Sequence, residues 1–134
     1  MGVELANMFH YTVETAKTFE ATLIALKDSL KDHKFGVLWE MDVPVTLQSK
    51  GFDFTTKYQI LEVCNPNQAY KAISQNSLTG YFLPCKIVVY EEGGKTKMGL
   101  PKPTVLMDFL NDATIKEIAQ EVEKELINAV NEAV

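Results

Sequence analysis

The residues best suited to chemistry are two cysteines, each beside a proline at an expected strand boundary. Cys64 lies in Glu62-Val63-Cys64-Asn65-Pro66, and Cys85 lies in Leu83-Pro84-Cys85-Lys86. A thiol just before a helix start can be activated, because the unpaired amides and the helix dipole stabilise a thiolate there. The favoured interpretation of Cys64 is nevertheless a small buried hydrophobic side chain, since free cysteine is among the most buried residue types.

The two thiols form a candidate redox pair if their strands are neighbours in the sheet. A disulfide requires Cα atoms within roughly 7 Å of one another, a distance that depends on strand pairing. The spacing of Cys64 and Cys85 matches no C-x-x-C pattern, and no histidine lies close to either in the sequence. We therefore expect no metal at these residues and assign no cofactor.

Two carboxylates, Glu40 and Asp42, are two residues apart on another expected strand. Side chains with this spacing share a face, so the pair could bind a cation, accept hydrogen bonds from a ligand, or act as acid and base. The alternative is that they form the solvated side of a half-buried strand. Lys50 and Lys57 are candidate ion-pair partners in either case.

Composition restricts the partners of the protein. The chain has 134 residues, 46% of them hydrophobic, a net charge of −5, and no arginine. We expect one domain over residues 1–134, and no nucleic-acid partner, because phosphate and base recognition depend on basic faces rich in arginine. No apolar run approaches the roughly 18 residues of a membrane helix, and no signal peptide is recognisable. With only two cysteines, we expect a cytoplasmic protein with free thiols.

Hydrophobic periodicity predicts the elements that position these residues. Apolar residues alternate along 9–13, 37–43, 58–64 and 85–91, which predicts strands, and Gly93-Gly94 predicts a hairpin into a fifth strand over 95–100. Helical spacing predicts amphipathic helices after Thr18, after Asn65 and after Asn111 or Asp112, with these residues as N-caps. Residues 46–50 could form one helical turn, and Pro101 and Pro103 predict an irregular segment.

The predicted order is therefore β-α-β-β-α-β-β-α. The tight turn between the last two strands and the one-sided strand patterns predict an α+β two-layer sandwich. We expect a five-stranded, at least partly antiparallel sheet with helices on one face.

Other local patterns carry no function. Gly93-Gly94-Lys95-Thr96 lacks the first glycine and the following helix of a phosphate-binding loop. His10 and His33 have no serine or cysteine partner in a familiar arrangement, and we assign neither a role.

Several motifs, taken in order, resemble a known family. They are Phe35-Gly36-Val37-Leu38 with Glu40-Met41-Asp42-Val43, then residues 60–66 with Ala69, then Leu83-Pro84-Cys85 before a valine-rich strand. Together they are similar to the bacterial and archaeal family called domain of unknown function 302, over nearly the whole chain. The resemblance implies a compact α+β domain of split β-α-β type, commonly a homodimer, with no established activity.

The family motif positions carry over to this sequence as a candidate site. They correspond to Glu40, Asp42, Cys64, Asn65, Pro66, Leu83, Pro84 and Cys85, with Lys50 where the family tends to have a lysine. One departure is Lys34, which precedes Phe35 where the family usually has glycine. This departure affects only the end of the first helix.

Three functions are compatible with these residues, and a binding role is favoured over a catalytic one. The first is a homodimeric small-ligand-binding module with a pocket at Cys64, Asn65, Pro66, Pro84 and Cys85, and with Glu40, Asp42 and Lys50 nearby. Amides at the helix start after Asn65 would bind a polar or anionic group. The second is a redox protein or enzyme that uses Cys64 with Cys85 as resolving partner. The third is a structural homodimeric interaction protein.

Overall fold

The computed structural model describes residues 9–134, which form five strands, five α-helices and two short 3-10 helices. In chain order the elements are β1 His10–Thr15, α2 Phe19–Asp32, β2 Gly36–Asp42, α3 Val43–Ser49, β3 Tyr58–Cys64, α4 Pro66–Gln75, η1 Ser77–Tyr81, β4 Cys85–Glu92, β5 Lys95–Pro101, α5 Pro103–Met107, η2 Asp108–Leu110 and α6 Ala113–Ala133.

The strands form one sheet in the order β1-β5-β4-β3-β2, and every neighbouring pair is antiparallel. The strands β1 and β2, which α2 connects, are the two edges, so this β-α-β unit is split by three other strands. The predicted α+β two-layer fold with an at least partly antiparallel, five-stranded sheet is confirmed, and the sheet is antiparallel throughout.

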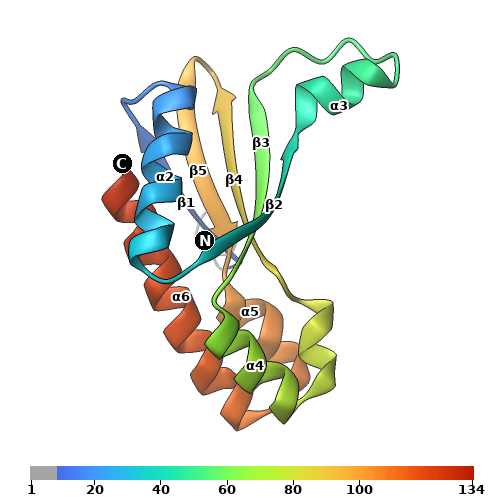
Figure 1. Cartoon of the computed structure of the whole chain (residues 1–134), viewed down its shortest axis with the longest axis vertical. Coiled ribbons are helices and arrows are strands. Elements are labelled where there is room, and N and C mark those ends of the chain that lie inside the picture. The colour runs from blue at the N-terminus through green and yellow to red at the C-terminus, as the bar shows by residue number, and fades with distance from the viewer. Residues whose placement is uncertain (1–8) are drawn as a thin grey trace, which may run out of the picture.

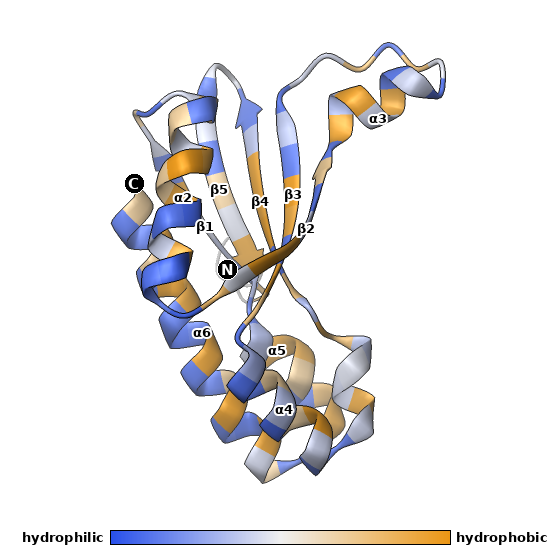
Figure 2. Ribbon diagram, in the orientation of Figure 1, coloured by the Kyte–Doolittle hydropathy of each residue, from blue (hydrophilic) through white to orange (hydrophobic). Residues whose placement is uncertain are grey.

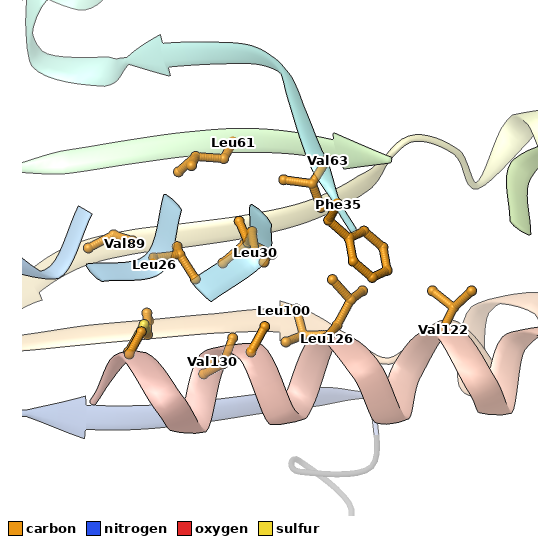
Figure 3. Packing of buried hydrophobic residues seen from close by; sticks show 14 of the residues in the cluster. Leu26, Leu30, Phe35, Leu61, Val63, Val89, Leu100, Val122, Leu126 and Val130 are labelled. Atoms are coloured by element: carbon orange, nitrogen blue, oxygen red, sulfur yellow. The ribbon is translucent and has the colours of Figure 1, made fainter. Parts of the chain in front are cut away.

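Helices α2 and α6 cover one face of the sheet (Figure 1). The core lies between these layers, because alternate strand residues point toward the helices while their neighbours point away. Figure 3 shows this packing, which includes Leu61 and Val63 from β3, Val89 from β4, Leu26 and Leu30 from α2, and Leu126 and Val130 from α6.

A second apolar cluster lies beyond one end of the sheet, where α4 and α5 pack beside the first half of α6 (Figure 1). Its buried residues are Ala72, Met107, Ile115 and Ala119. The prediction of irregular structure at the two prolines was wrong. Pro101 ends β5, and Pro103 begins α5, where a missing amide proton costs no helical hydrogen bond.

The predicted helix starts are confirmed. The side chain of Thr18 accepts a hydrogen bond from the Ala21 amide at 3.1 Å, and the carboxylate of Asp112 accepts from the amides of Thr114 and Ile115. Such caps satisfy amides that have no partner within the helix.

One element, α3, stands away from both layers. It begins directly after β2, with Asp42 as its N-cap, and is longer than the single predicted turn. Figure 1 shows α3 and the following loop projecting past the end of β2 and β3, far from α4 and α5. We call α3 with residues 50–57 the arm.

The face of the sheet opposite α2 and α6 is not covered by a helix (Figure 1). Because successive side chains of a strand point to opposite faces, the neighbours of the buried strand residues lie on this surface, which we call the open face. Its residues are His10, Thr12 and Glu14 on β1, Trp39 and Met41 on β2, Tyr58, Ile60 and Glu62 on β3, Lys86, Val88, Tyr90 and Glu92 on β4, and Lys95, Lys97, Gly99 and Pro101 on β5.

Candidate functional site

The register of β3 and β4 brings the two cysteine segments together. Cys85 lies directly opposite Val63, the residue before Cys64. Both cysteines line one narrow hollow between the end of the sheet, α4 and α6, with a volume of about 20 Å³. A hollow of this size has room for about one water molecule. The two segments therefore meet, but the space between them is too small for an organic ligand.

Both thiols are free, and their surroundings disfavour the thiolate. Burial raises the pKa of Cys64, the opposite of the change that a helix start was expected to produce. Burial, together with charge on the neighbouring Cys64, raises the pKa of Cys85 to about 12. Because the thiolate is the nucleophile, protonated thiols at neutral pH weaken the redox and enzyme interpretations.

Asn65 and Pro66 begin α4 as the sequence predicted. The side-chain oxygen of Asn65 accepts a hydrogen bond from the Gln68 amide at 3.3 Å, and Pro66 occupies the first helical position. The Gln68 side chain donates to Glu121 at 3.0 Å and does not reach back to the backbone amide of Asn65, so only one half of a capping box is formed. Its amide oxygen is buried in the wall of the narrow hollow without a hydrogen-bond partner among the described residues.

Glu40, Asp42 and Lys50 do not lie near the cysteines, contrary to our expectation. Asp42 pairs with Gln59, five residues before Cys64 on β3, which corresponds to about 17 Å along the strand. Asp42 caps α3, and Lys50 ends it. The antiparallel pairing of β2 with β3 thus places Asp42 and Lys50 at the opposite end of the sheet, and Glu40 opposite Leu61 in the middle of β3.

The predicted ion pairs of the acidic strand residues were also wrong. Glu40 is bound by Lys27 of α2 at 2.8 Å and by the side chain of Gln59 at 2.9 Å, while Lys57 binds Glu20. Burial opposes the charged form of Glu40, but Lys27 and Gln59 together lower its pKa. This carboxylate therefore joins the sheet to α2.

A larger pocket opens beside Pro84 and Cys85, at the end of the open face. It has a volume of about 410 Å³, within the range of roughly 300–1,000 Å³ that is typical of small-molecule sites. Its lining residues are Phe9, Glu62, Tyr81, Phe82, Leu83, Pro84, Cys85, Lys86, Pro101, Pro103, Leu106 and Met107. We call this space the Pro84 pocket. Its walls are mostly apolar, and the Leu83–Pro84 peptide in its rim is cis.

Two side chains of opposite charge line the wall of the Pro84 pocket that the sheet forms. Glu62 and Lys86 face each other in the β3–β4 register. Within residues 9–134, no carboxylate lies at ion-pair distance from Lys86. Sequence reasoning missed both residues, although each alternates with buried neighbours and so had to lie on the opposite face.

Comparison with known proteins assigns the family. A family model described as "Domain of unknown function DUF302" matches residues 11–133. The chain belongs to the DUF302 family. It is similar to an uncharacterized conserved DUF302 protein from Bacillus stearothermophilus, whose crystal structure matches with a TM-score of 0.91. The two are 50% identical, over 95% of this chain and 99% of that one. No curated protein matches the chain.

The described part of this DUF302 chain contains neither a cluster of three metal-ligating His, Cys, Asp or Glu residues nor a helix able to cross a membrane. The two hollows that are lined by a cysteine differ in chemistry. The hollow between the cysteines is narrow, whereas the Pro84 pocket combines apolar walls with a lysine that is not paired within the described residues. An apolar cavity with a few polar groups is the usual form of a site for a small organic molecule.

Proposed function

We propose that this DUF302 protein is a small-ligand-binding module, and that its site is the Pro84 pocket. The observation that supports this proposal is a cavity of about 410 Å³ that combines apolar walls with Glu62 and Lys86. The proposed site retains Pro84 and Cys85 from the family motif. It differs from the site expected from the sequence, because it excludes the hollow between the thiols and does not include Glu40, Asp42 or Lys50.

The lining indicates the chemistry of the ligand. The side chains of Phe9, Phe82 and Leu106 offer apolar contact, and Lys86 offers an ammonium group that lies opposite Glu62 but makes no ion pair within residues 9–134. A molecule with an apolar body and one carboxylate suits this arrangement, because a charge-assisted hydrogen bond to lysine adds orientation to apolar burial.

Nuclear magnetic resonance tests this proposal directly. Amide shifts of the ¹⁵N-labelled protein are recorded with a panel of aromatic and branched aliphatic carboxylates. We expect saturable shifts in residues 81–86 and 103–107, and we expect Lys86→Glu to require higher ligand concentrations for the same shifts. Lys116→Glu, the same charge change on an exposed position of α6, is the matched control and should bind as the unmodified protein does. Absence of shifts in both segments for every acid would refute the site.

We further propose that the protein is a homodimer through the open face. The centre of this face is apolar and only half-buried, with Tyr58, Ile60, Val88 and Tyr90 in neighbouring strands and Trp39 49% exposed. Tyr58 and Tyr90 stack with ring centroids 5.4 Å apart. An aromatic centre within a polar rim is the usual composition of a protein interface.

Charge supports a second copy as the partner. The rim of the open face carries three lysines and three glutamates, so it is neutral although the chain has a net charge of −5. Its ion pairs, Lys97 with Glu92 and Lys95 with Glu14, lie at the end of the sheet opposite the Pro84 pocket. Two acidic molecules can therefore approach through this face without net repulsion.

Sedimentation equilibrium tests the homodimer. The protein should dimerise at micromolar concentration, and Val88→Asp should render it monomeric by placing a charge in the apolar centre. The matched control is Ile24→Asp, at a position 65% exposed on the helical layer, which should remain dimeric. A monomer at all concentrations would refute the proposal.

Both cysteines are free, and we propose a reducing cytoplasm as the location of the protein.

A further inference from the structure

The arm carries apolar side chains that the rest of the chain does not bury. No residue of α3 is buried, and Val45 and Phe52 are 62% and 63% exposed. Figure 2 shows strongly hydrophobic positions on α3 although the helix stands clear of both layers. Exposed apolar side chains gathered on one projecting element are typical of a contact surface.

The arm is nevertheless held in a defined conformation by its own hydrogen bonds. The carboxylate of Asp42 accepts from the Val45 amide at 3.1 Å, and the Phe52 amide donates to the carbonyl of Leu47 at 3.1 Å. The side chain of Gln48 donates to the carbonyl of Phe54 at 2.7 Å and closes the loop. Because the arm is already ordered, little conformational entropy is lost when it packs against a partner.

The base of the arm is continuous with the open face. The arm leaves the sheet after β2, which carries Trp39 and Met41, and returns at Tyr58, the first residue of β3. At its return, Lys57 binds Glu20 of α2 at 2.8 Å, which holds the base of the arm to the helical layer. Because Trp39, Met41 and Tyr58 lie on the open face next to this base, a partner seated on that face has the arm at the edge of its contact.

The area of the open face indicates that a dimer needs more than the sheet. Five strands spaced about 4.8 Å apart and about 22 Å long cover roughly 500 Å². A stable interface buries roughly 800 Å² on each partner. The arm is a projecting apolar element at one edge of this face, and it can supply the remaining area.

We infer that the arm of each copy packs against the second copy and completes the dimer interface that begins on the open face. This inference rests on the proposed homodimer and assigns the arm a role within it. The occupant is a second copy because the arm follows β2, an edge strand of the neutral face through which two acidic chains can meet. Val45 and Phe52 are the contact side chains on the arm.

The test measures the dimer dissociation constant of the full chain by sedimentation equilibrium for four forms. These are the unmodified protein, the arm variant Val45→Ser with Phe52→Ser, the face variant Val88→Asp, and the control Ile24→Ser. The arm variant should raise the dissociation constant at least tenfold and leave the circular dichroism spectrum unchanged, because neither residue is buried. The control should change neither quantity.

The possible results separate the two proposals. A dimer that Val88→Asp disrupts, but that the arm variant leaves unchanged, overturns the role of the arm and retains the open-face dimer. An unmodified protein that stays monomeric, or a dimer that resists both variants, overturns the open-face dimer and the arm with it. Weakening by both variants, but not by the control, supports both.

Discussion

The backbone amide of Phe35 donates a hydrogen bond to the carbonyl oxygen of Leu30 at 2.9 Å, across the end of α2. The amide of Lys34 donates to the carbonyl of Lys31 at 3.0 Å, so the two bonds form a Schellman motif. Phe35 and Leu30 are both in the core. The chain turns from α2 into β2 only because Lys34 adopts a left-handed conformation, with φ of 66°.

Replacing Lys34 with glycine should stabilise the protein. A side chain in the left-handed region costs roughly 1–2 kcal/mol, and glycine avoids this cost while losing more entropy on folding. We expect a net gain of about 0.5–1 kcal/mol in the free energy of unfolding, measured with urea. The matched control Lys31→Gly, inside the last turn of α2, should lose about 1 kcal/mol. A loss of stability in the Lys34 variant would contradict this account of the helix end.

Gly99→Ala should destabilise the pairing of β1 with β5. A Cβ atom at Gly99 would lie 2.6 Å from the Thr12 hydroxyl and 2.7 Å from the carbonyl oxygen of Tyr11. Because backbone must move, we expect a loss of about 1–3 kcal/mol in urea denaturation. Gly80→Ala is the control, since nothing lies within 4 Å of its Cβ position. Equal effects of the two substitutions would show that close strand approach is not the cause.

Protonation of His33 should stabilise the packing of α2 on α6. Its ring nitrogens lie 2.7 Å from Glu125 and 2.8 Å from Glu132, and these carboxylates raise the pKa of His33 above its usual 6.5. A pKa raised by folding contributes stability that is complete below the unfolded value of 6.5 and is lost as pH rises through the folded value.

Denaturation at a series of pH values from about 5 to about 9 tests this linkage. The free energy of unfolding should fall as pH rises above 6.5, and His33→Gln should remove that fall. The control His10→Gln, at the β1 edge of the sheet, should show the same fall in the free energy of unfolding as the unmodified protein. If the unmodified protein and the His33 variant show the same pH profile, the two glutamates do not stabilise the protonated histidine.

The thiols should react slowly in the folded protein. Burial raises the pKa of both, to about 12 for Cys85, so little thiolate is present at neutral pH. We expect iodoacetamide to label Cys64 first as pH increases, and Cys85 only after denaturation, as followed by mass spectrometry. Rapid labelling of either thiol near pH 7 would contradict the raised pKa of that thiol and would support the redox interpretation.

Local patterns were sufficient to predict much of the fold. Alternation around Leu61 and Val63 identified a half-buried strand, and Thr18 and Asp112 were recognisable caps because their side chains act within one helical turn. Gly93 and Gly94 both have positive φ, which is why the pair marks the β4–β5 hairpin. These features depend on neighbours within a few residues.

The site was harder to predict because it depends on long-range pairing. The antiparallel register of β2 and β3 separates Asp42 from Cys64, and no local signal encodes it. The Pro84 pocket draws residues from segments as distant as Phe9 and Met107. Nothing in the pattern of residues 43–57 shows that the arm leaves the body of the molecule.

Ligand affinity at the Pro84 pocket tests the central proposal most directly. Isothermal titration with the carboxylate that shifts the pocket amides most strongly would compare the unmodified protein with Lys86→Glu, Leu106→Trp and Lys116→Glu. We expect Lys86→Glu to weaken binding on the order of tenfold, since a hydrogen bond to a charged group contributes roughly 1.5 kcal/mol. Leu106→Trp should abolish binding by filling the cavity, and Lys116→Glu should leave it unchanged. Equal affinity in all four proteins would contradict a ligand site in this pocket.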